Sequence, residues 1–296
     1  MRWNPIFVTL VFSALSTSLP ADCIKKEDHR SNRNSGVLVT DFVISGTQSL
    51  NSDDLNRIRG QMIGGCYDED SDELQQYIRA LFQNRGYFAV EVKGLNIKPL
   101  DTLGVPKPVV LDADVQEGRL FRLGEIQFSG NHAFSAAKLR NVFPLKKGAL
   151  FERDKIAGGL DSLSNLYGKD GFLDLMSVPD TENVSSGTIR LSIAVEEGPQ
   201  YRMGKLDVLA KKEIADKLHS AWQLPEGAVF DPSYIDHYVR ANRSLLPSEF
   251  TRDSVQVIRD CPAALVEVRL PIDISEVASH PLPNSVNCEA SRDRPE

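Results

Sequence analysis

The chain has 296 residues, of which 41% are hydrophobic and 25% are charged, as in ordinary soluble globular proteins. A chain of this length has room for two or three domains. The formal net charge of −7 gives no sign of a broad basic surface, so we expect no nucleic-acid partner.

Residues 1–21 are predicted to be a signal peptide. Arg2 supplies a positive start, residues 6–15 form a short apolar run, and small residues around Ala21 suit cleavage. The run is shorter than the roughly 20 residues that a membrane-spanning helix needs. We therefore expect export and no integral membrane segment after cleavage. The alternatives are an uncleaved inner-membrane anchor and a lipoprotein attached at Cys23.

The sequence repeats itself after the predicted signal peptide. "DFVISGTQSLNSDDL" (41–55) matches "EIQFSGNHAFSAAKL" (125–139), and "EGRLFRLGEIQF" (117–128) matches "EGPQYRMGKLDV" (197–208). Such self-similarity at a fixed spacing indicates tandem structural units. We predict a disordered linker at 22–36, three repeats at 37–117, 118–198 and 199–274, and a disordered tail at 275–296.

Each repeat is predicted to run strand–helix–helix–strand–strand. In the first repeat, the strands are predicted over 37–46, 87–97 and 108–118, and the helices over 53–62 and 71–86. Apolar alternation breaks near Asp41, where we expect a β-bulge or a change of register. Ser52 is expected to cap the first helix.

A glycine followed by an aromatic residue ends the second helix in two repeats. Gly86 precedes Tyr87, and Gly171 precedes Phe172. Glycine adopts the left-handed backbone conformation that often ends a helix, so both are expected to shape the fold. The third repeat has "LLPSEFT" (245–251) instead and is therefore the divergent one.

These signatures resemble the POTRA (polypeptide-transport-associated) domain, which occurs in outer-membrane assembly proteins of the BamA and TamA type. The residues that carry the resemblance are the strand segments "FVISG" and "IQFSG", the loops "KGALFE" (147–152) and "EGAVFD" (226–231), and the helix ends "NRGYF" and "KDGFL". The resemblance implies an α+β fold of tandem small β-α-α-β-β units, each a three-stranded mixed sheet with two helices on one face. Residues after 274 do not read as the β-barrel that follows these domains in the transporters.

The resemblance implies a periplasmic module, associated with the outer membrane, that binds outer-membrane proteins or the machinery that assembles or secretes them. An extended segment would add to the open edge of a sheet, at the strand after each second helix. The candidate edge residues are Tyr87, Phe88, Val90 and Val92 in the first repeat and Phe172, Leu173 and Leu175 in the second. Phe88, Val90 and Val92 alternate onto one face of the predicted strand, and core packing alone would give the same pattern. A tethered inner-membrane scaffold and a truncated barrel protein remain alternative functions.

The sequence shows no catalytic or cofactor motif, so we expect neither an enzyme nor a cofactor. The five histidines have no zinc-ligand spacing, and "DEDSDE" (68–73) lacks the glycine and the final glutamate of a calcium loop. That acidic run is expected to cap the second helix. Of the three pairings open to the four cysteines, Cys261 with Cys288 would tie the tail to the third repeat.

Overall fold

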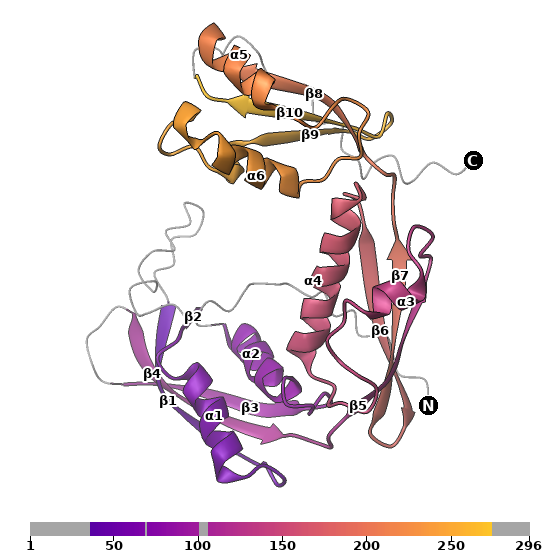
Figure 1. The fold of residues 1–296 in the computed structure, drawn as a ribbon. Coiled ribbons are helices and arrows are strands. Elements are labelled where there is room, and N and C mark those ends of the chain that lie inside the picture. Colours follow the sequence, from indigo (N-terminus) through magenta and orange to yellow (C-terminus); the bar gives the residue numbers. More distant parts are fainter. Residues whose placement is uncertain (1–35, 69, 101–105, 274–296) are drawn as a thin grey trace. The chain divides into compact units, whose positions relative to one another are not determined.

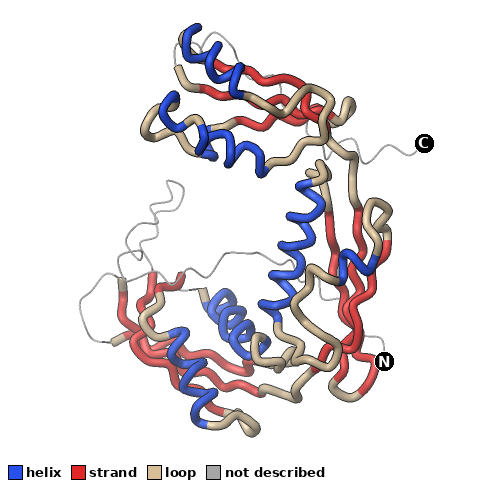
Figure 2. The backbone as a smooth tube through the Cα atoms, in the orientation of Figure 1, coloured by secondary structure: helices blue, strands red, loops and turns tan. Residues whose placement is uncertain are grey.

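The computed structural model describes residues 36–68, 70–100 and 106–273 (Figure 1). The predicted signal peptide and tail lie outside these residues, as does the predicted linker apart from Gly36. The described chain forms three small sheets, each with helices on one face (Figure 2). This arrangement confirms the predicted α+β fold class. The chain divides into two compact units, the first of which combines residues up to Phe121 with Leu150–Arg153.

The first sheet has four strands in the order β2-β1-β4-β3. Its elements are β1 (Gly36–Ser45), α1 (Ser52–Met62), β2 (Cys66–Asp68), α2 (Ser71–Gln83), β3 (Glu91–Pro99) and β4 (Lys107–Gln116). β1 runs parallel to β4, whereas β2 and β3 are antiparallel to their neighbours. The β1–β4 register shifts between Val39 and Asp41, which confirms the predicted irregularity.

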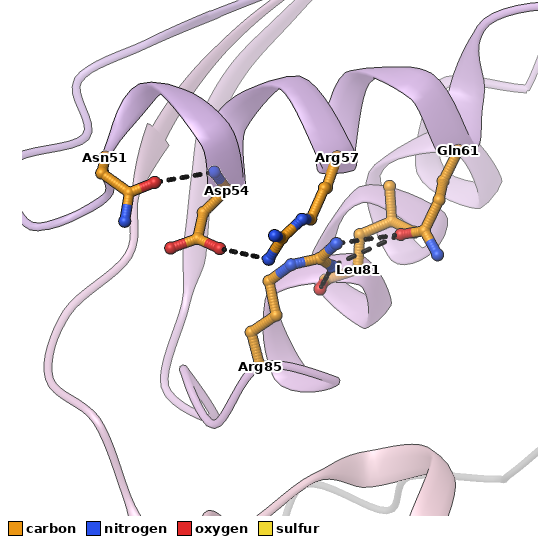
Figure 3. A network of polar contacts seen from close by, with 6 residues as sticks. All are labelled: Asn51, Asp54, Arg57, Gln61, Leu81 and Arg85. Carbon is orange, nitrogen blue, oxygen red and sulfur yellow. Dashed lines mark hydrogen bonds and ion pairs between the residues drawn. The ribbon is translucent and has the colours of Figure 1, made fainter.

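Apolar residues at helical spacing hold α1 and α2 on this sheet. Ile58 and Met62 of α1 and Ile78 and Phe82 of α2 are buried against strand residues such as Phe42. Fully burying a side chain of this size contributes about 1.5–3 kcal/mol. Figure 3 shows how Arg85, just beyond α2, joins the two helices: its guanidinium donates to Gln61 of α1 (3.3 Å) and to the carbonyl of Leu81 (2.8 Å).

Two sequence predictions for the first repeat were wrong in detail. Asn51, and not Ser52, caps α1, because its side-chain oxygen accepts a 2.8 Å hydrogen bond from the N–H of Asp54. The prediction of three strands missed β2, since three residues are too few to show alternation. The acidic run does cap α2: Asp70 accepts from the N–H groups of Asp72 and Glu73.

The second and third sheets each have three strands. The second, in the order β5-β7-β6, is built from β5 (Arg122–Ser129), α3 (Ala136–Arg140), α4 (Arg153–Lys169), β6 (Met176–Ser185) and β7 (Thr188–Glu196). The third, in the order β8-β10-β9, is built from β8 (Arg202–Leu209), α5 (Lys212–Ala221), α6 (Ser233–Ala241), η2 (Arg243–Leu245), η3 (Arg252–Ser254), β9 (Gln256–Asp260) and β10 (Leu265–Pro271). In both, the first strand is parallel to the last and the middle strand in sequence lies at an edge.

Candidate interaction surfaces

In every sheet, a short segment pairs with the start of the first strand. The pairs of main-chain hydrogen bonds that do so are Gly64 to Val39 and Val39 to Gly65, Gly148 to Leu123 and Leu123 to Ala149, and Gly227 to Met203 and Met203 to Ala228. Gly64, Gly148 and Gly227 share a φ between 80° and 83°, where glycine is favoured. The segment that includes β2 is thus the structural counterpart of the "KGALFE" and "EGAVFD" loops. The internal repeats of the sequence did not reveal this correspondence.

The opposite edges are β3, β6 and β9, and no other described strand pairs with them on the far side. An unpaired strand edge presents backbone N–H and C=O groups that an incoming strand can use. The three edges differ in which of these groups they offer.

β3 offers donors at its centre. The N–H of Leu100, just after β3, donates to the carbonyl of Pro108 in β4 at 3.0 Å. Because successive strand residues direct their backbone groups to opposite sides, Asn96 and Lys98 also face β4, and Leu95 and Ile97 face the open edge. The side chains of Leu95 and Ile97 pack against the core of the first sheet. A register shift between Val92 and Gly94 precedes this stretch.

β6 lacks donors at its centre. Pro179 has no N–H, and prolines in sheets lie where the missing group would face solvent. Two residues on, and therefore on the same side, the N–H of Thr181 donates to the carboxylate of Asp180 at 2.8 Å. An incoming strand would find carbonyls here but no free donor at these two positions.

β9 is the shortest of the three edges, with five residues. The guanidinium of Arg259 in β9 contacts the carboxylate of Asp174, which lies in the turn before β6. The Asp174 side chain is only 8% exposed and also accepts a 2.6 Å hydrogen bond from the hydroxyl of Tyr201. These contacts keep the turn that contains Asp174 next to the side chain of Arg259 on the open edge of the third sheet.

Of the seven candidate edge residues, only Val92 lies in a strand. The predicted strand starts were wrong, because each C′ glycine is followed by a further turn before the ladder begins at Glu91 or Met176. The other candidates occupy these turns: Tyr87, Phe88 and Val90 between α2 and β3, and Phe172, Leu173 and Leu175 between α4 and β6. Tyr87, Val90 and Val92 are buried in the first core.

The glycines have the predicted left-handed conformation, with φ of 87° at Gly86 and 84° at Gly171. Tyr87 N–H donates to the carbonyl of Phe82, and Phe172 N–H to that of Tyr167, which is the longer bond of a Schellman motif. The two glycines therefore follow their helices in the predicted conformation, although α2 stops at Gln83 and not at the predicted residue 86.

The glycine in each of these turns also accepts a main-chain hydrogen bond from a residue later in the chain. The N–H of Phe121 donates to the carbonyl of Gly86, and the N–H of Tyr201 donates to the carbonyl of Gly171, both at 2.8 Å. The ring of Phe88 packs edge-on against Phe121 and Phe151, with centroid distances of 6.5 and 5.1 Å. Phe88 thus helps to hold the junction between the turn after α2 and the residues around Phe121. The sequence analysis did not predict this role.

A glutamate at the end of the last strand holds the loop that follows the first strand. Glu117, 2% exposed, accepts from the N–H groups of Gln48 and Ser49 at 2.6 Å each. Glu197 accepts from the N–H groups of His132 and Ala133 at 2.7 and 2.9 Å. Burial opposes ionisation of both carboxyls, but these hydrogen bonds outweigh it and lower the pKa of each below its ordinary value.

A comparison with protein families identifies the middle of the chain. The POTRA model, described as "Surface antigen variable number repeat", matches residues 121–198, which include every strand of the second sheet. This segment of the chain therefore matches the POTRA family, and it includes Gly171 and Glu197.

The tandem arrangement also matches a solved structure. POTRA domains 3–5 of BamA from Haemophilus influenzae superpose with a TM-score of 0.57 at 16% identity, over 79% of this chain and 94% of that one. At this identity the likeness establishes the fold of the chain.

Curated relatives match this chain over a small part of their own length. A putative outer membrane protein assembly factor of Treponema pallidum is 23% identical over 181 residues, which are 57% of this chain and 21% of that protein. The outer membrane protein assembly factor BamA of Neisseria meningitidis is 25% identical over 127 residues, or 38% and 16%. The chain thus spans about a fifth or less of these relatives.

The described part of the chain contains no cluster of three or more His, Cys, Asp or Glu residues suited to a metal, and no helix with the length and apolarity to cross a bilayer. Cys66 and Cys261 each take part in a disulfide bond. Cys288 lies outside the described residues, so its predicted pairing with Cys261 stays a prediction.

Proposed function

We propose that this chain is a periplasmic protein-binding module of outer-membrane protein assembly or secretion. The observation that carries this proposal is the open edge that recurs in each sheet, where β3, β6 and β9 have no described strand on their far side. Its similarity to proteins named as outer membrane assembly factors supports the same role. The N-terminal sequence supports delivery to the periplasm.

Strand addition is proposed at β3. Its open edge presents the N–H and C=O groups of Leu95 and Ile97, whereas Pro179 and Asp180 remove or occupy donors on β6. β9 is shorter, and its Arg259 contacts Asp174. Val92, the remaining strand residue among the predicted candidates, lies at the start of β3 on the other side of the register shift.

The partner at β3 is an extended segment with alternating apolar residues. Leu95 and Ile97 are half-buried on the helix side, so an added strand would continue the core with its own apolar side chains there. Each main-chain hydrogen bond contributes about 0.5–1.5 kcal/mol, so the interaction is weak and reversible. Such binding suits a transient receiver of unfolded chains.

The test is a pair of substitutions at Ile97. Ile97→Pro removes the open-edge N–H, and Ile97→Ala removes a comparable part of the side chain but keeps that N–H. We expect Ile97→Pro to abolish photocrosslinking of an alternating apolar peptide to a probe at Asn96, and Ile97→Ala to weaken it only partly. Equal loss in both variants, or equal labelling from a probe at Thr181, would overturn strand addition at β3.

The proposed export has its own test. Sequencing the N-terminus of the protein purified from its native cells should find Asp22 as the first residue. An intact Met1 would instead support the tethered scaffold.

A further inference from the structure

The second sheet has one face that its helices leave uncovered. Along β7, Leu191, Ile193 and Val195 are buried, so the alternate residues Ser192, Ala194 and Glu196 lie on the other face. The strand register extends this outer face onto the neighbours: Glu125, Gln127 and Ser129 of β5, and Met176, Val178, Asp180 and Glu182 of β6.

One end of this outer face is apolar. Val178 is 56% exposed, the highest value among the exposed large hydrophobic residues of the described chain. Its cross-strand partner Ala194 is also exposed, and Met176, next on the same face of β6, is 41% exposed. Three neighbouring apolar side chains therefore meet at the β6–β7 pair.

The rest of the face is acidic. Arg190 forms 2.7 Å ion pairs with Glu125 on one side and Glu182 on the other. Asp180 and Glu196 flank the apolar end, and Arg190 is already engaged with the other two carboxylates. The apolar end is thus bordered by negative charge that Arg190 does not neutralise.

We propose that this face binds a polypeptide segment carrying apolar side chains next to Lys or Arg. The apolar residues would cover Val178 and Ala194, and the cations would lie against Asp180 and Glu196. Charge complementarity of this kind favours a basic partner and disfavours anionic lipid or nucleic acid. The site uses side chains on the sheet face, so it is independent of strand addition at β3.

The outer face of the third sheet lacks this combination. There Lys205 pairs with Glu267, and Arg269 pairs with Asp207 at 2.8 Å. On the first sheet, Val43 is 42% exposed opposite Asp112, without a second exposed large apolar residue beside it in the register. Val43 therefore provides a control position of similar exposure.

The test measures binding of fluorescent peptides to the full chain after signal cleavage. One peptide carries adjacent Val and Lys residues, and a second replaces each Lys by Glu; both contain proline at alternate positions to prevent strand pairing. We expect Val178→Thr to weaken the lysine peptide about fourfold, as loss of one buried methyl group predicts. Asp180→Asn with Glu196→Gln should weaken it further and reduce its salt dependence.

Several outcomes would overturn the proposal. These are equal binding of the lysine and glutamate peptides, an equal effect of Val178→Thr and the control Val43→Thr, or binding to vesicles rich in anionic lipid that Asp180→Asn does not weaken. A lysine peptide that fails to bind at all would overturn it as well. None of these results would bear on the Ile97 test of strand addition.

Discussion

The hydroxyl of Tyr167 in α4 donates a 2.8 Å hydrogen bond to the carboxylate of Glu197. The same oxygen accepts hydrogen bonds from the N–H groups of His132 and Ala133. One carboxylate oxygen after β7 therefore joins α4 to the loop after β5. Burial, together with the hydrogen bond to the Glu197 carboxylate, raises the pKa of Tyr167, which keeps it a donor at neutral pH.

The Glu197 contacts predict acid sensitivity. Because the folded pKa of Glu197 lies below its unfolded value, its contribution to stability is present above the unfolded pKa and is lost as pH falls through the folded one. Glu197→Gln should lower the free energy of unfolding by about 1–2 kcal/mol at neutral pH and flatten its decline below about pH 4. Denaturant unfolding at several pH values measures this, with the neighbouring Glu196→Gln as control. Parallel acid profiles in the two variants would contradict it.

The glycine at the end of α4 should not tolerate a side chain. Gly171 has φ of 84°, and an added Cβ would lie 2.6 Å from the carbonyl oxygen of Tyr201. Gly171→Ala should therefore destabilise the chain by more than the roughly 1 kcal/mol that left-handed backbone strain alone costs. Gly168, in the same helix, has nothing within 4 Å of such a Cβ, so Gly168→Ala should stabilise by about 0.5–1 kcal/mol. Thermal unfolding compares the two, and equal effects would refute the reasoning.

Phe88 should stabilise the junction with Phe121. Removing its ring by Phe88→Ala deletes edge-on contacts with Phe121 and Phe151 that are each worth about 0.5–1.5 kcal/mol beyond area burial. The amide of Phe121, bonded to the carbonyl of Gly86, should then exchange with deuterium faster. Leu100→Ala, at an exposed site in the same unit, is the control. Unchanged exchange at Phe121 would mean that the ring does not hold the junction.

Asp174 should couple Tyr201 to Arg259. Asp174→Asn keeps the shape of the side chain but removes the charge that Arg259 contacts and weakens the bond from the Tyr201 hydroxyl. Since the carboxylate is almost fully buried, we expect a loss of about 1–3 kcal/mol. A double-mutant cycle with Arg259→Met measures the coupling, which should exceed about 0.5 kcal/mol. Strict additivity would show that the contact contributes nothing.

The sequence was most informative where one short segment determines the structure. The left-handed Gly86 and the irregularity at Asp41 each follow from a few neighbouring residues. The cap of α1 was misplaced by one position because Asn51 and Ser52 are both good capping residues. Strand starts were placed too early because Phe88, Val90 and Val92 alternate like a strand, although the first two precede β3.

Features that join distant residues could not be predicted from the sequence. The bond from Phe121 to Gly86 spans 35 residues, and nothing local marks either group as its partner. The segment around Gly64 resembles its counterparts in backbone geometry but not in sequence, so only the structure shows that it pairs with the start of β1. The difference between β3 and β6 depends on which strands pair, and no short segment of the sequence specifies that pairing.

The position of Phe151 affects how the chain can mature during synthesis. The first compact unit includes residues 150–153, so its aromatic contacts require a segment made well after β4 is complete. While the chain emerges from its N-terminus, the ring of Phe88 must remain without Phe151 until about 35 further residues have followed Gln116. Completion of the first unit is therefore tied to the arrival of the segment that carries Phe151.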